Sequence, residues 1–472
     1  MRYMSVRKLL YRVVCGCLAA GVGVSLSGCG GSTSSSSTIS TVTPKTAVQV
    51  NMGDAPADWM LAFSMNISSM SLTGAGGSTA VISSPVTMEM LHLMGTMQPL
   101  AMVNVPQGTY TGATITIGSA TMMYMDPASK TAVQKTIAGP VTGTVTFSTP
   151  VTVGSTPMAI GFDLDLANSV ALNAAGAMTM TPTFHTTSGM QGAGNAADPA
   201  NGGIQQMMGV VAGVTGSSFG MTSLQAAQNF TFSTNGSTVF SGTSMSGMAN
   251  GMPVLVNAML QPDGSLMATK VQSMGSAGAM GGGVMTAVTG VPATAITIVM
   301  QNGAGIGMMA SNFAAGVTVT PGGTVTYAID TDGINMTGLP FTPVFDGSHV
   351  YAGQCVMPVA SAGMTTSGMG GMMGGSPMAG SMTASQIVLE QQGLSGTVAT
   401  AINAGVSGSF TLTLPAGSAF TTLTGATTVM VFQQTQTTMA GASQIAAGST
   451  MHAFGLLFYE GGQWKMVASR LG

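Results

Sequence analysis

The sequence has little charge and few aromatic side chains. Charged residues make up 5% of the 472 positions and aromatic residues another 5%, whereas 45% are hydrophobic. Disordered chains are usually rich in charge and poor in apolar residues, so this composition predicts buried cores. Four of the ten Lys and Arg lie before position 13, which leaves six against thirteen Asp and Glu. Without a basic patch to neutralise phosphates, nucleic acid is excluded as a partner.

Cysteine is equally scarce. The four cysteines are Cys15, Cys17, Cys29 and Cys355, and the first two lie in an N-terminal segment with the character of a cleaved signal. If Cys29 is modified, Cys355 is left alone and no disulfide can form within the chain. Cys355 lies in an apparent strand without activating neighbours, which predicts a buried, inert thiol.

Long hydrophobic runs are also missing after the N-terminus, where the strongest signal lies. Arg2, Arg7, Lys8 and Arg12 precede an apolar run, Val13 to Leu26, that is shorter than the roughly 20 residues of a membrane-spanning helix. The run ends in Leu26-Ser27-Gly28-Cys29, which resembles the lipobox of bacterial lipoproteins.

The lipobox resemblance implies a fate for this segment. Residues 1–28 would be the signal peptide, with cleavage between Gly28 and Cys29, and Cys29 would carry diacylglycerol and an N-acyl chain. Gly30 stands where an Asp commonly signals inner-membrane retention, so the expected location is the outer membrane, on either its periplasmic or its surface face. No other cofactor is expected.

Period-two alternation dominates the next part of the chain. Residues 29–46 are rich in Ser, Thr and Gly and predict a flexible tether. Residues 47–187 then alternate apolar with polar residues in short segments separated by turn residues, for example AFSMNISSMSL and GTVTFSTPVTV. This pattern is typical of a β-sandwich.

Several motifs in this region occur in a familiar order. They are Asp54-Ala55-Pro56, Leu91 to Leu93, Val105-Pro106-x-Gly108-x-Tyr110-Thr111, Phe162-Asp163-Leu164-Asp165 and Asn168-Ser169-Val170. Together they resemble the bacterial lipoprotein domain called domain of unknown function 4382. That resemblance implies a sandwich fold and an envelope location, and it implies no reaction.

An internal repeat follows a predicted linker at 188–206. Three units, 207–275, 283–390 and 394–472, open alike with Gly209 to Val214, Gly283 to Val288 and Gly396 to Ala401. They also close alike, with Ala-Thr-Lys-Val, Ala-Ser-Gln-Ile and Ala-Ser-Arg-Leu.

A hairpin turn precedes the closing strand in each unit. The first and third units turn at Pro262-Asp263-Gly264 and Glu460-Gly461-Gly462, whereas the second has a Met/Gly-rich tip at 360–382. The units resemble domain of unknown function 5666, which implies small OB-like barrels. The predicted fold is therefore all-β, an N-terminal sandwich followed by three OB-like β-barrel repeats.

Two groups of residues are candidates for binding. Asp163 and Asp165 lie two apart on a predicted strand and share a face, so they either bind a cation or have a structural role. The tip offers thioethers, which suit Cu(I), at Met364, Met369, Met372, Met373, Met378 and Met382. Methionine as a flexible hydrophobe is the alternative for the tip, as it is for Met88, Met90, Met94 and Met97 around His92.

Patterns of catalysis are missing from the sequence. The four histidines have no metal spacing, and neither a G-x-S-x-G elbow nor a P-loop occurs. We expect a non-enzymatic, lipid-anchored envelope protein with a binding or structural role and an envelope protein or glycan as partner. The alternatives are soft-metal handling through the Met-rich tip and glycan binding, although two Trp residues provide few aromatic platforms.

Overall fold

A computed structural model describes residues 43–472, apart from positions 56, 94–96, 174–175, 191–200, 224, 227, 274–281, 302–315, 332, 361–380 and 440–443. The described part is almost entirely β-structure, which confirms the predicted all-β class. The predicted signal peptide, most of the predicted tether, Gly28 and Cys29 lie outside the described residues. Within the described part, no helix combines the length and apolar character that crossing a bilayer requires.

The N-terminal domain is a sandwich of two sheets. The first sheet has the order β11-β8-β1-β5, with β1 (Lys45–Ala55) parallel to β8 (Met158–Asp165) and antiparallel to β5 (Met97–Pro106). Its edge strand is β11 (Phe184–Met190).

The second sheet has the order β3-β2-β6-β7, with β4 also paired to β2. Its strands are β2 (Met60–Gly74), β3 (Gly77–Ala80), β4 (Val86–Glu89), β6 (Gly108–Asp126) and β7 (Thr131–Val153). Two short strands, β9 (Val170–Leu172) and β10 (Met178–Met180), pair separately.

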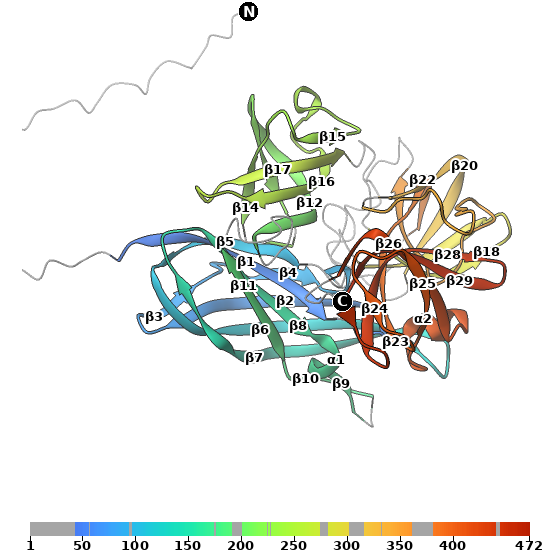
Figure 1. Cartoon of the computed structure of the whole chain (residues 1–472), viewed down its shortest axis with the longest axis horizontal. Helices are drawn as coiled ribbons and strands as arrows, with labels where there is room; N and C mark the ends of the chain where they lie inside the picture. Colours follow the sequence, from blue (N-terminus) through green and yellow to red (C-terminus); the bar gives the residue numbers. More distant parts are fainter. Residues whose placement is uncertain are drawn as a thin grey trace, which may run out of the picture. The chain divides into compact units, whose positions relative to one another are not determined.

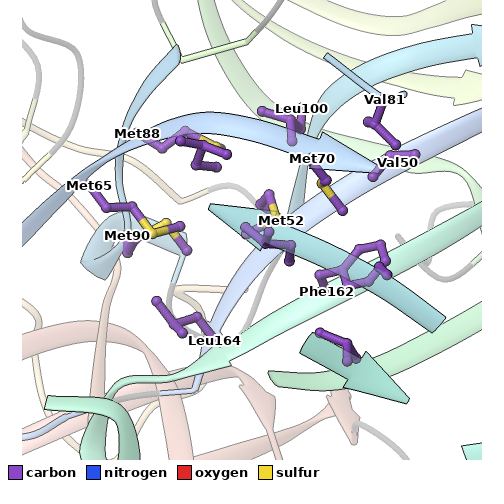
Figure 2. Packing of buried hydrophobic residues seen from close by; sticks show 14 of the residues in the cluster. Val50, Met52, Met65, Met70, Val81, Met88, Met90, Leu100, Phe162 and Leu164 are labelled. Atoms are coloured by element: carbon purple, nitrogen blue, oxygen red, sulfur yellow. The ribbon is translucent and has the colours of Figure 1, made fainter. Parts of the chain in front are cut away.

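Alternating side chains from both sheets form the sandwich core. Along β2 the buried positions include Phe63, Met65 and Ile67, with more accessible residues between them, as a half-buried strand requires. Methionine fills much of the interior: Met52, Met65, Met70, Met88 and Met90 are buried together with Phe162 (Figure 2). The thioether chain is flexible enough to fill such gaps.

Three further domains follow, which we call barrels 1, 2 and 3 (Figure 1). Barrel 1 consists of β12 (Gly203–Val214), β13 (Ser218–Thr222), β14 (Asn229–Ser233), β15 (Val239–Ser241), β16 (Pro253–Leu260) and β17 (Leu266–Ser273). Barrel 2 consists of β18 (Gly283–Thr289), β19 (Ala295–Met300), β20 (Val317–Ile329), β21 (Cys355–Ala360) and β22 (Ser381–Leu389). Barrel 3 consists of β23 (Gln392–Val398), β25 (Gly408–Thr413), β26 (Thr428–Met439), β28 (Thr450–Glu460) and β29 (Gln463–Leu471), with the small pair β24 (Ile402–Asn403) and β27 (Gln444–Ile445).

The three barrels share one strand order. Without β15 and the small β24–β27 pair, each barrel has five strands. The first of these pairs with the second and the fourth, and the last two pair antiparallel. The third strand runs parallel to the last, through β14–β17, β20–β22 and β26–β29, and this pairing closes the ring. The arrangement is a five-stranded barrel of the OB type, which confirms the predicted barrel repeats.

The glycine that opens each repeat has a physical reason. A Cβ on Gly209, Gly283 or Gly396 would lie 2.7, 2.2 or 2.4 Å from a backbone oxygen of the second strand. Those distances are shorter than any van der Waals contact, so only glycine allows the first strand to approach the second this closely.

A segment of barrel 2 that we call the strap, residues 330–354, packs against barrel 3. The strap links the third and fourth strands of barrel 2, and its side chains Ile334, Phe341, Phe345 and Val350 are buried. The same core cluster includes Phe432, Leu456, Phe458 and Val467 of barrel 3. Barrel 1 instead has a core cluster of its own, whose buried members run from Ile204 to Val271.

Candidate functional site

Asp165, one of the two candidate carboxylates, ends β8 and caps a short helix. Its side chain accepts hydrogen bonds from the backbone N–H of Asn168 (3.0 Å) and from the Asn168 amide (2.7 Å), at the start of α1 (Leu166–Ser169). It also lies 3.3 Å from Nε2 of His185 on β11. Asp165 therefore has a defined structural role as an N-cap.

Asp163 lies in a different environment. Burial is the main cause that raises its pKa to about 6; His185 and Arg470 of barrel 3 oppose the increase, and Asp165 adds to it. Asp54, on β1 next to β8, is fully buried, and neither of its carboxylate oxygens has a hydrogen-bond partner. Burial, with Asp163, Glu89 and Asp165 nearby, holds the pKa of Asp54 well above its usual range. Burial without a hydrogen-bond partner disfavours the charged form of this carboxyl.

A cation bound by these carboxylates has no support from the geometry. Among the residues that the structure describes, no group of three or more His, Cys, Asp or Glu side chains converges as metal ligands would. Hard cations such as Ca²⁺ need six to eight oxygen ligands at short range. The hydrogen bonds by which Asp165 caps α1 favour a structural role for Asp163 and Asp165.

A second polar cluster joins the sandwich to barrel 3. Ser395 on β23 and His452 on β28 are paired across the barrel wall, with 2.7 Å between Oγ and Nδ1. The carboxyl group of Asp58, in the turn before β2, lies next to the hydroxyl and the backbone N–H of Ser395. The backbone oxygen of Asp58 also accepts from Ala419 N–H at 2.6 Å, at the start of α2 (Ala419–Thr424).

Charge in this cluster is suppressed by burial. Burial raises the pKa of Asp58 despite the hydrogen bonds from Ser395 and the nearby His452. Burial also lowers the pKa of His452, against the opposing effect of Asp58 and Asp165, so the imidazole is neutral at pH 7.

Ser395, His452 and Asp58 do not form a catalytic triad. In a triad the histidine accepts the serine proton and the carboxylate orients the histidine. Here the carboxylate faces the serine, and Ser395 is only 3% exposed. The Ser395 hydroxyl lies between His452 of barrel 3 and Asp58 of the sandwich, which is the position of a link between the two domains.

The candidate methionines separate into two sets. Met364, Met369, Met372, Met373 and Met378 lie outside the described residues. Met382 is part of β22, is 4% exposed and packs in the core of barrel 2. The strands flanking the tip also include positions 360 and 381, so the hairpin tip is shorter than 360–382. Met382 is a packing residue and not a member of an exposed thioether cluster.

The methionines around His92 are also packing residues where the structure describes them. Met88 and Met90 are completely buried in the sandwich core, next to Met65 (Figure 2). His92 instead binds Glu89, with 3.1 Å between Nδ1 and Oε2. Met94 lies outside the described residues.

Cys355 is buried at the start of β21, as the sequence predicts. Burial, with Glu390 and Glu89 nearby, holds the pKa of its thiol well above the ordinary value. A protonated, inaccessible thiol is a poor nucleophile.

The aromatic side chains offer little for sugar stacking. Trp464 is 6% exposed and is enclosed by Phe420, Tyr351 and Tyr459, with ring centroids 5.0–6.1 Å apart within this group. Trp59 is half-buried and packs edge-on against Tyr124. Both Trp residues serve the packing of their domains.

One comparison with known proteins bears on barrel 1. A family model described as "Domain of unknown function (DUF5666)" matches residues 208–272, which correspond to nearly all of barrel 1. No curated protein matches the chain. The match agrees with the family resemblance seen in the repeat sequence, for the first unit.

Sequence reasoning missed the junction residues. Ser395 and His452 lie in different strands, and Asp58 lies more than 300 positions earlier in the chain. The only local signal is a polar residue among apolar neighbours in each strand, and that signal does not reveal the partner.

Proposed function

We propose that the protein is a lipid-anchored, non-catalytic scaffold or binding protein of the bacterial cell envelope. The observation that carries the proposal is the N-terminal arrangement of basic residues, a short apolar run and Leu26-Ser27-Gly28-Cys29. Cleavage before Cys29 and acylation of its thiol hold the mature chain at the outer membrane.

The fold supports this proposal in two ways. The first strand begins at Lys45, so residues 30–44, rich in Ser and Thr, are available as a spacer between lipid and fold. The described domains are also linked to one another by buried contacts: Leu61, Met123 and Met125 of the sandwich share an apolar cluster with Val299 of barrel 2 and Ala419 of barrel 3. Buried contacts between domains suit a protein that presents its binding surfaces in a fixed arrangement.

We infer that the sandwich is of the type called domain of unknown function 4382. The motifs of that resemblance have definite structural roles. The Tyr110 hydroxyl donates to the Pro106 carbonyl at 2.8 Å, Asp165 caps α1, and Leu91–Leu93 form the short 3₁₀ helix η1.

The soft-metal and glycan alternatives have less support. Met382 is in a barrel core, and Trp464 is enclosed by other rings.

Labelling with a fatty-acid analogue tests the proposed anchor. In a bacterial host, the wild-type protein should take up label and fractionate with the outer membrane. Cys29→Ser should lose the label and the membrane fraction, whereas Cys355→Ser should keep both, because its thiol is buried. Label on the Cys29→Ser variant, or wild-type protein found free in the periplasm, would contradict the proposal.

A further inference from the structure

A pocket lies where the sandwich meets barrels 2 and 3, with a volume of about 100 Å³. Its apolar wall includes Leu61, Leu394 and Phe420, and several glutamines add amide groups. The titratable side chains that line it are Asp58, His92, Asp330, Cys355 and Glu390, and neither Lys nor Arg is among the described lining residues. The pocket thus offers hydrogen-bond acceptors and carboxyl groups, and no Lys or Arg of the described residues lines it.

Glu390 is the carboxyl without a partner in this pocket. Its backbone N–H donates to the Cys355 carbonyl at 2.9 Å, which fixes the residue just after β22. No described residue hydrogen-bonds its carboxyl group. Burial and, to a smaller extent, the neighbouring Asp330 together raise the pKa of Glu390 to about 8. A carboxyl that lines a cavity and lacks a counter-ion is expensive to ionise, unless a ligand supplies the positive charge.

The walls next to Glu390 are held rigidly. The Gln392 amide accepts from the Cys355 N–H at 2.6 Å and donates to the Gly353 carbonyl at 2.8 Å. The Gln301 amide donates to the Leu61 carbonyl at 2.8 Å, which ties barrel 2 to the sandwich at the same place. A ligand would therefore enter a preformed site, as small-molecule sites generally are.

We infer that this pocket binds a small organic amine that carries a hydroxyl group, with its ammonium group against the Glu390 carboxylate. The hydroxyl would bond to the polar wall, and the carbon atoms would lie against Leu61, Leu394 and Phe420. A metal ion is a poorer fit, since the described His, Cys, Asp and Glu side chains form no metal-binding group. The site is separate from the lipid anchor and does not depend on it.

The inferred site has a proton linkage. Glu390 must ionise to pair with an ammonium ion, so binding near pH 7 releases a proton. The other titratable groups that face the pocket are Asp58, His92, Asp330 and Cys355. Binding should therefore strengthen as the pH rises toward about 8 and the carboxylate forms.

Titration calorimetry of the full mature chain tests the inference with three probes of similar size. Ethanolamine should bind, whereas ethylene glycol, which is neutral, and glycolate, which is anionic, should not. Glu390→Gln should weaken ethanolamine binding at least tenfold. This variant should fold, because the wild-type carboxyl is already uncharged at neutral pH.

Glu460→Gln is the matched control, since it makes the same substitution at a carboxylate outside the pocket, paired with Lys465. It should leave binding unchanged. Failure of ethanolamine to bind, equal binding of ethylene glycol, or undiminished binding by Glu390→Gln would each overturn the inference. None of these results depends on whether Cys29 is acylated.

Discussion

Barrel 1 and the pair of barrels 2 and 3 have the same strand order but different cores. The difference lies in the connection between the third and fourth strands. In barrel 1 this connection, residues 234–252, returns to its own barrel, where β15 pairs with β17 and Met248 is buried in the barrel 1 core. In barrel 2 the strap carries Phe341 onto barrel 3, with 5.2 Å between the ring centroids of Phe341 and Phe432. Repetition of a topology therefore does not imply repetition of an independent folding unit.

Polar contacts strengthen the link between barrels 2 and 3. Gln354 of the strap is fully buried and donates to the Leu457 carbonyl at 2.9 Å. Lys465 lies over the Phe341 ring, 4.8 Å from its centroid, and forms an ion pair with Glu460. These interactions leave barrel 3 with part of its surface covered by a segment of barrel 2.

The largest expected effect comes from removing the aromatic ring of the strap. Phe341→Ala should destabilise barrels 2 and 3 together by about 3–5 kcal/mol, because it opens a cavity in the core that they share. Chemical denaturation followed by tryptophan fluorescence reports this loss, since Trp464 lies in barrel 3.

The matched control is Met248→Ala in the connection of barrel 1. It should leave the Trp464 transition in place, because the core cluster of barrel 1 contains no residue of barrel 3. If Met248→Ala shifted that transition as much as Phe341→Ala does, the contrast between the two regions would be wrong.

A smaller effect should follow from filling the space at the repeat glycine of barrel 3. Gly396→Ala places a Cβ 2.4 Å from the Thr413 carbonyl oxygen, and the backbone must shift. Forced overpacking of this kind costs about 1–3 kcal/mol. Gly408→Ala, in β25 of the same barrel, meets no atom within 4 Å and should change the free energy of unfolding by less than about 0.5 kcal/mol. Equal losses in the two variants, measured by thermal unfolding, would show that the close approach is not what requires glycine.

Much of the fold follows from local sequence patterns. Alternation predicts strands such as β16, where every second residue is buried, and β2, where alternation covers part of the strand. The recurring opening glycines and closing strands predict the shared barrel order, because each motif occupies the same strand of its barrel. The turn at Pro262-Asp263-Gly264 joins β16 to β17 as hairpin chemistry requires.

The rest depends on contacts between distant segments. Strap residues such as Phe341 show no periodicity, so nothing local reveals that they pack on another repeat. Met382 lies at the end of the Met/Gly-rich tract, yet it is a buried residue of β22. The composition of the tract does not reveal that one of its methionines belongs to a strand. Asp165 is a partial exception: Asp is a preferred N-cap residue, and the helix begins directly after it.

Hydrogen exchange on the full chain, followed by mass spectrometry under native conditions, tests most directly whether barrels 2 and 3 form one unit. We expect amides of β19 and β21 to open with the same free energy as those of β26 and β29, and amides of β12 and β16 to open with a different one. Phe341→Ala should lower the opening free energies of barrels 2 and 3 together and leave those of barrel 1 unchanged. Independent opening of barrels 2 and 3, or opening of all three barrels as one, would contradict this division into units.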